Sequence, residues 1–142
     1  MYGFKTSKTS VTTVTQYQPV LVNFENVDFN TNNFMQINGS GTEFQCTQGG
    51  IYNISFNVQT EQDFLQGKSV AEVGLRINGN TVDVCIMSYR VNDTITYVGS
   101  TTEKLSPGDK FVVRYIPPRN VTSYNIKIYP GSFLAMGGGA EA

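Results

Sequence analysis

Histidine, the commonest general base and metal ligand, is absent from the 142 residues. A serine or cysteine nucleophile would therefore need another activating base. The two cysteines, Cys46 and Cys85, lie far apart and in no metal-ligand spacing. We expect both to be buried free thiols, because free cysteine packs as a small hydrophobic side chain. Whether the two form a disulfide is not decided by the sequence, because this depends on the geometry between them.

Carboxylates are the remaining candidates for acid–base or metal chemistry. The close acidic pairs are Glu25 with Asp28, Glu61 with Asp63, and Glu72 with Asp83 across an expected hairpin. Acids on solvated strand faces are ordinary, and none of these pairs has the spacing of a known calcium loop. We expect no catalytic residue, no metal site, no cofactor and no enzyme activity.

Composition limits the classes of partner. Apolar residues make up 39% of the chain, charged residues 15%, and the net charge is −1. Without clustered Lys and Arg there is no electrostatic basis for binding nucleic acid or an anionic membrane. No run approaches the roughly 18 apolar residues of a membrane span, and the N-terminus lacks the apolar segment of a secretory signal. We expect one domain, no membrane insertion and no Sec export.

Alternating side chains predict the central strand, from Cys46 to about Thr60. Its apolar residues share one parity and polar residues occupy the other, as in a strand with one buried face; the apolar set is Tyr52, Ile54, Phe56 and Val58. Asn78-Gly79 stands between two further alternating runs and predicts a tight β-hairpin. Both features indicate a protein built from antiparallel strands.

Further short strands are expected at 20–24, 34–37, 97–105, 111–115, 124–128 and 132–136, with a polar loop beginning at residue 27. No segment has a helical period over ten residues, so the fold class is an all-β sandwich or jelly roll. We assign residues 19–136 to this domain. Residues 1–18 form a Ser/Thr-rich arm, either a disordered terminus or a tether that orders on a partner. Residues 137–142 form a flexible Gly-rich tail.

Four motifs, in order, resemble the globular head of complement component 1q, in the tumour necrosis factor-like superfamily. They are Phe44-Gln45-Cys46 followed by residues 50–56, the hairpin of residues 74–80, the strand–turn–strand of residues 100–111, and the closing strand of residues 131–135. Together they span roughly residues 20–136. The chain differs from animal members in having a Ser/Thr arm, no collagen repeat and no signal peptide, and these differences disfavour secretion.

The resemblance implies a ten-strand jelly-roll β-sandwich that forms a compact homotrimer. Superfamily members include complement and cytokine-like ligands, spore-surface proteins, and fibre or decoration proteins of viruses and phages. Five strand aromatics either all pack in the core or partly form the trimer interface; they are Tyr52, Phe56, Phe111, Tyr115 and Phe133. The resemblance favours core plus interface.

The functional hypothesis is a non-enzymatic trimeric head on a virion or phage surface. It would attach to a capsid protein through residues 1–18 and bind a host receptor or glycan, or stabilise the shell. One alternative is a recognition head on a bacterial cell or in the extracellular space. A second is a structural protein of the capsid shell itself.

Overall fold

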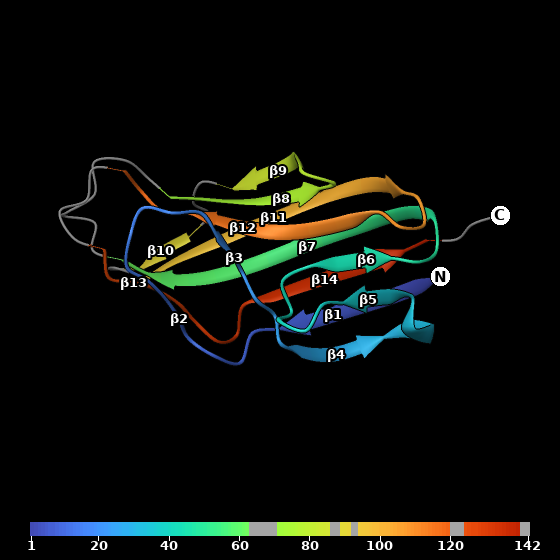
Figure 1. Cartoon of the computed structure of the whole chain (residues 1–142), viewed down its shortest axis with the longest axis horizontal. Coiled ribbons are helices and arrows are strands. Elements are labelled where there is room, and N and C mark those ends of the chain that lie inside the picture. Colours follow the sequence, from blue (N-terminus) through green and yellow to red (C-terminus); the bar gives the residue numbers. More distant parts are fainter. Residues whose placement is uncertain (63–70, 86–88, 92–93, 120–123, 140–142) are drawn as a thin grey trace.

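The computed structural model describes residues 1–62, 71–85, 89–91, 94–119 and 124–139. These residues form two antiparallel sheets packed face to face, which confirms the predicted jelly-roll sandwich (Figure 1). One sheet has eight strands, in the order β10-β11-β7-β14-β1-β4, with β13 beside β7 and β2 beside β13. The other has six, in the order β5-β6-β12-β8-β9 with β3 beside β12.

The eight-stranded sheet comprises β1 (Tyr2–Ser7), β2 (Thr12–Val14), β4 (Asn26–Asn30), β7 (Gly50–Glu61), β10 (Tyr89–Val91), β11 (Thr94–Leu105), β13 (Ile126–Ile128) and β14 (Phe133–Gly138). The six-stranded sheet comprises β3 (Val20–Leu21), β5 (Met35–Ile37), β6 (Phe44–Cys46), β8 (Glu72–Ile77), β9 (Asn80–Cys85) and β12 (Lys110–Ile116). A short 3₁₀ turn, η1 (Thr31–Asn33), joins β4 to β5. No helix in the described part of the chain is long and apolar enough to cross a membrane.

Strand β7 is the centre of the larger sheet, as its alternation predicts. It pairs with β11 over its whole length on one side and with β14 on the other. The predicted strand beginning at Cys46 is divided, however, because β6 belongs to the opposite sheet. Cys46 accepts a hydrogen bond from the Gly108 amide (2.7 Å), which ties β6 to the turn before β12. The chain then crosses to β7.

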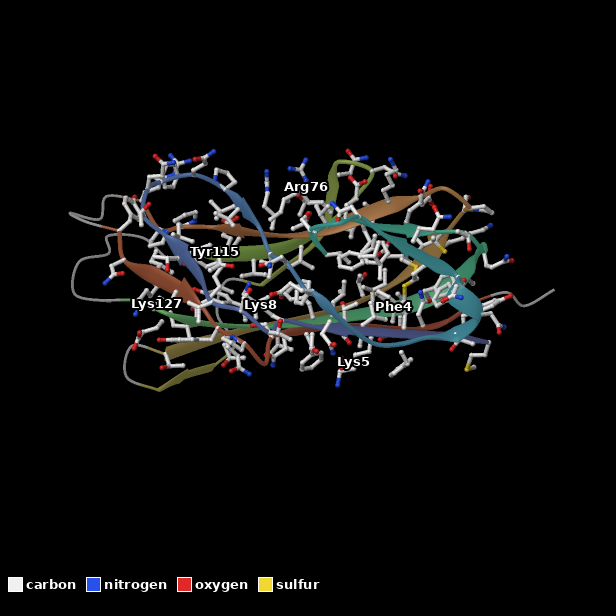
Figure 2. The ribbon with its side chains drawn as sticks, turned by 60° about the horizontal axis from the view of Figure 1, so that its bottom comes forward. Phe4, Lys5, Lys8, Arg76, Tyr115 and Lys127 are labelled. Atoms are coloured by element: carbon white, nitrogen blue, oxygen red, sulfur yellow. The ribbon has the colours of Figure 1, made fainter. Side chains whose placement is uncertain are left out.

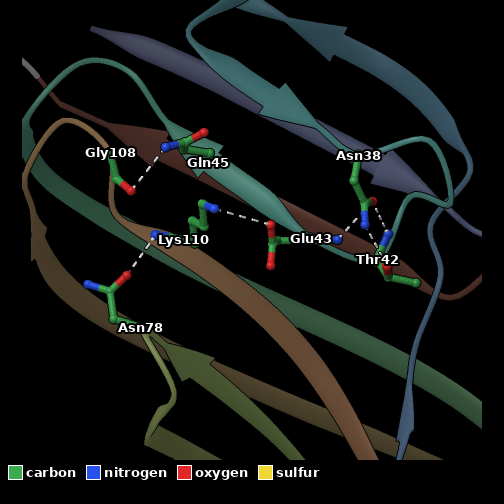
Figure 3. Close-up of polar contacts among 7 residues, drawn as sticks. All are labelled: Asn38, Thr42, Glu43, Gln45, Asn78, Gly108 and Lys110. Carbon is green, nitrogen blue, oxygen red and sulfur yellow. Dashed lines mark hydrogen bonds and ion pairs between the residues drawn. The ribbon is translucent and has the colours of Figure 1, made fainter.

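The Asn78-Gly79 hairpin is confirmed. Both residues have positive φ, 50° and 84°, as a two-residue type I′ turn requires. The Asn78 side chain also accepts a hydrogen bond from the Lys110 amide (3.0 Å), so this turn is fixed to the start of β12 (Figure 3). Beside it, Lys110 pairs with Glu43 at 3.7 Å, between side chains about half exposed. Such an exposed pair adds little stability.

The N-terminal arm is a wrong prediction. Strand β1 lies inside the eight-stranded sheet, paired with β14 and β4, and β2 pairs with β13. Phe4 and Thr6 are fully buried. Polar side chains at inward positions hide the strand period, because Thr6 and Lys8 point inward where apolar residues are expected. Residues 26–30, expected to begin a loop, form β4 at the edge of the same sheet.

The flexible tail is also wrong for residues 137–139. Gly137 and Gly138 belong to β14, and the Gly139 amide donates to the Ile51 carbonyl at 2.8 Å. Gly138 has φ +128°, and a Cβ there would lie 2.4 Å from the same carbonyl oxygen. Glycine is needed here for close backbone approach and not for flexibility. Residues 140–142 lie outside the described residues.

The core between the sheets is rich in aromatic rings. Phe44 stacks on Phe111 at 5.5 Å between centroids, and Phe34 stacks on Tyr52 at 5.7 Å. Phe4 contacts both Phe34 and Phe44 edge-on. Cys46 is fully buried with a free thiol, as expected, and its sulfur donates to the Gln48 carbonyl. The side chain of Cys85 lies outside the described residues.

Two buried polar clusters fix the strands around this core. The Ser132 hydroxyl, fully buried, accepts from the Gln59 amide and donates to the Tyr129 carbonyl, both at 2.9 Å. Gln62, 5% exposed, accepts from the hydroxyl of Tyr115 at 3.2 Å. Burial raises the pKa of Tyr115 far above its usual value, and the neighbouring Tyr97 adds to the rise.

Candidate interaction surfaces

The face of the eight-stranded sheet that points away from the core is the first candidate surface; we call it the outward face. Its centre consists of small side chains in register across neighbouring strands. Ser55 of β7 lies between Ser100 of β11 and Ala135 of β14. One row further, Gly137 lies opposite Gly3. Small residues in register leave a backbone surface that another protein can approach closely.

Exposed apolar side chains also lie on the outward face. Ile51 is 63% exposed and Phe29 52%, and the Phe29 ring lies over Gly3. A shallow hollow of about 400 Å³ opens on the outward face between Phe29, Ser55 and Ala135. Phe29 lines this hollow, and Ile51 lies apart from it, beside Lys104 and Gly139. Exposed apolar residues on one face of a sheet are typical of an interaction surface.

Two cations on this face are Lys5 and Lys104. Lys5 extends away from the sandwich, whereas its neighbour Phe4 lies between the sheets (Figure 2). The Lys5 ammonium lies 5.0 Å from the centre of the Phe133 ring, a cation–π contact that covers part of that ring. Lys104 lies directly opposite Ile51 in the β11–β7 pairing.

Four of the five aromatics considered for the trimer interface are buried inside the single chain, so that prediction is wrong for them. Tyr52 and Tyr115 are 0% exposed, and Phe56 and Phe111 1%. A side chain with no surface in the lone protomer offers nothing to a second one. Phe133, half-buried, does lie on the outward face. Strand parity explains why the other four are buried, since the apolar face of a half-buried strand is the face that packs in the core.

A second candidate surface lies at the end of the sandwich opposite to the chain ends. Both described ends of the chain lie together, because Tyr2 pairs with Gly138, which lies beside Tyr52 near the start of β7 (Figure 1). The opposite end carries a cluster of exposed Tyr17 and Arg119 with half-buried Tyr124, which we call the distal cluster. The Arg119 guanidinium lies 5.5 Å from the Tyr17 ring centre, and the two tyrosine rings are 6.5 Å apart.

Contacts with the strand ends hold the distal cluster in place. The Tyr124 hydroxyl donates to the Pro118 carbonyl at 2.9 Å, and Tyr17 remains 43% exposed. Tyrosine and arginine are the residues that most often dominate binding energy at interfaces. No sequence motif indicates this cluster, because Tyr17 lies 102 positions before Arg119 in the numbering.

The acidic pairs do not form an acid–base or metal site in the described residues. Glu25 accepts from the Thr9 amide, whereas Asp28 accepts from Ser7 and Asn26. Asp83 lies opposite Leu75 and not opposite Glu72, so the expected hairpin pair is wrong. Asp63 lies outside the described residues. No group of three or more possible metal ligands occurs in the part of the chain described.

Glu61 has a structural role instead. It accepts a hydrogen bond from the Tyr129 hydroxyl at 2.6 Å, and this bond raises the pKa of Tyr129. The contact joins the end of β7 to the loop before β14, on the solvent side.

No protein-family profile and no curated protein matches the chain. Solved structures do match. The globular domain of zebrafish complement 1qA aligns with a TM-score of 0.64 at 14% identity, covering 96% of each chain. Murine APRIL aligns with a TM-score of 0.70 at 14% identity, covering 95% of this chain and 96% of that one. Eiger TNF from S. frugiperda aligns with a TM-score of 0.62 at 14% identity, covering 99% of this chain and 94% of that one. This likeness establishes the complement 1q and tumour necrosis factor type of jelly-roll fold.

Proposed function

We propose that the chain is a non-enzymatic jelly-roll head that associates into a homotrimer through its outward face. The observation that carries the proposal is that the exposed apolar side chains Ile51 and Phe29 lie on the same sheet face as a row of small residues. Burial of such side chains in an interface is favourable by about 25 cal/mol per Å² of apolar area. The resemblance to a superfamily of homotrimeric heads supports the stoichiometry.

The small residues let neighbouring protomers approach closely. Ser55, Ala135 and Gly137 leave little side-chain volume between the sheet backbone and a second protomer. Lys5 lies between Ala135 and Phe29 in the same row, and Lys104 lies opposite Ile51, so both long side chains would have to extend their ammonium groups to water at the edge of the interface. Three copies of the face close on one another, so the assembly stops at a compact oligomer and does not grow into a fibre.

The distal cluster is the recognition surface in this proposal. Because both described chain ends lie at one end of the sandwich, a head attached through them presents the other end outward. Three copies of Tyr17 and Arg119 would then bind as a rigid set, so that weak single contacts gain avidity. A host receptor or glycan with planar apolar faces suits such tyrosines.

A head of this kind decorates a larger particle, and we propose the surface of a virion or phage. The neutral polar composition, with 15% charged residues, supports an exposed surface position. Attachment uses the chain-terminal end of the sandwich and not a free arm, because β1 is part of the sheet. A bacterial or extracellular recognition head would use the same two surfaces and remains the alternative.

The test is the mass of the purified protein in solution, measured by light scattering across a concentration series. A species of three chains is the expected result. A monomer at all concentrations would refute self-association through the outward face. Larger particles would instead favour the alternative of a shell protein. Replacement of Tyr17 and Arg119 by serine should leave the number of chains per particle unchanged and weaken attachment to the host surface.

A further inference from the structure

Lys8 is a buried lysine with amide and hydroxyl partners. The residue is 2% exposed, and its position is labelled in Figure 2. The Lys8 ammonium nitrogen, Nζ, lies 2.7 Å from the Thr12 hydroxyl and is also hydrogen-bonded to the side-chain oxygen, Oδ1, of Asn23. Thr12 and Asn23 contact one another at 3.1 Å. The three side chains thus form a closed triangle of polar atoms.

The three residues are held by different parts of the sandwich. Lys8 forms backbone hydrogen bonds to residues at the start of β14, donating to Ser132 and accepting from Gly131. Thr12 belongs to β2, which pairs with β13. These two strands belong to the eight-stranded sheet, so the amine and the hydroxyl are fixed to one rigid layer.

Asn23 is fixed to the other layer. Its neighbour Val22 donates to the Val113 carbonyl of β12, and Phe24 donates to the Gly41 carbonyl, both at 2.8 Å. Val22 and Phe24 are buried at 1% and 0% exposure. Because both neighbours are anchored, the Asn23 side chain is held against Lys8. Groups held in contact react far faster than the same groups free in solution.

The environment raises the uncharged fraction of the Lys8 amine, and the uncharged amine is the nucleophilic form. Burial lowers the pKa of Lys8, and the charge of Glu25 only partly offsets this. The nearby Glu25 carboxylate is held by the Thr9 amide and hydroxyl and by Ser10. The salt bridge that occurs among the described residues joins Lys110 to Glu43 and does not involve Lys8. A desolvated lysine is an activated nucleophile.

We propose that Lys8 and Asn23 join spontaneously in the folded chain through an intramolecular isopeptide bond. The neutral Lys8 amine attacks the side-chain carbonyl carbon, Cγ, of Asn23. The bond from Nζ to Cγ forms, and the bond from Cγ to the amide nitrogen Nδ2 breaks. One amine proton passes to Nδ2, which leaves as ammonia. The product is a secondary amide, and no oxidant or cofactor takes part.

Thr12 assists the attack. Its hydroxyl accepts from the Lys8 amine and donates to Oδ1 of Asn23, where negative charge develops as the tetrahedral intermediate forms. The hydroxyl therefore aligns the nucleophile and stabilises the carbonyl oxygen with a single group. The bond would connect the two sheets covalently, since Lys8 is fixed to one and Asn23 to the other.

The test is the intact mass of the full chain under denaturing conditions. The expected mass is lower than that of the sequence by one ammonia molecule. Digestion after Lys and Glu should then release residues 6–25 as one internally linked peptide, where an unlinked chain gives residues 6–8 and 9–25 separately. A chain with the full sequence mass, or with separate fragments, would overturn the proposal. Both measurements are made on the unaltered chain.

Succinimide formation at Asn78-Gly79 also releases ammonia, so a matched control is needed. Lys8→Arg keeps the charge, removes the nucleophile, and should restore the full mass. Asn23→Ala should do the same. Persistence of the mass loss in either variant would assign it to another site and refute the cross-link.

The role of Thr12 is tested by timing the mass change after cell-free synthesis. Thr12→Val should slow formation of the bond by roughly 100-fold, as loss of an oxyanion donor does. Thr12→Ser should restore the rate, because it keeps the hydroxyl. An equal rate in Thr12→Val would show that the hydroxyl takes no part.

Discussion

Replacement of Ile51 by glutamate should dissociate the proposed trimer without unfolding the protomer. Ile51 is 63% exposed on the outward face and lies directly opposite Lys104. In the lone protomer, Ile51→Glu places opposite charges across two strands, which is worth about 0.2–1 kcal/mol in favour of the fold. In the trimer, the same carboxylate would be covered by a neighbouring protomer and lose its water.

The size of the effect follows from the exposed fraction. Full burial of an isoleucine side chain is worth about 1.5–3 kcal/mol, so covering the exposed 63% of Ile51 contributes roughly 1–2 kcal/mol per protomer. Three protomers would lose roughly 3–6 kcal/mol. That is about two to four powers of ten in the association constant. Desolvation of the glutamate adds to this loss.

The assay is sedimentation velocity over a concentration series, with urea unfolding of the protomer measured in parallel. Val11→Glu is the matched control, because Val11 is 50% exposed but lies between β1 and β2, outside the outward face. Ile51→Leu should keep the trimer. If Ile51→Glu and Val11→Glu associate like the parent chain, Ile51 is not at the interface and the reasoning fails.

Three further predictions concern the fold. Ser132→Ala should lower the free energy of unfolding by about 1–3 kcal/mol, because the part-buried Gln59 amide loses its acceptor; urea unfolding measures this, and a loss near zero would contradict it. Burial raises the pKa of Tyr115, so the contribution of Tyr115 to stability should be constant below pH about 10 and fall above it as the unfolded chain ionises, and the fall in alkali should be shallower in Tyr115→Phe. Gly138→Ala should lower the melting temperature by strain worth about 1–3 kcal/mol, whereas Gly39→Ala, with open space around it, should not.

Much of the fold can be predicted from the sequence, because one face of most strands is apolar. The alternation in β7, the Asn78-Gly79 turn and the turn before β12 each depend on local chemistry, and each is present in the structure. Strand β1 could not be found this way. Its inward side chains include Thr6 and Lys8, whose burial depends on partners far along the chain.

The interaction surfaces were harder to predict for a related reason. Large aromatics such as Phe56 attract attention, yet their parity places them in the core. The useful signal is an apolar residue at a strand position whose side chain points away from the core, where the neighbouring side chains are polar. Ile51 is such a residue. The distal cluster and the Lys8–Asn23 contact carry no local signal at all, because each joins segments that only the folded chain brings together.

The pairing of β1 with β14 has a consequence for how the chain folds. The first and last described strands lie side by side in the middle of the larger sheet, and β14 separates β1 from β7. During synthesis, β1 and β7 are both made long before β14, so each has an unpaired edge until the end of the chain emerges. Closure of the sheet depends on contacts between residues at opposite ends of the sequence, which makes folding slow. The interval before β14 is complete is when the chain is most exposed to aggregation.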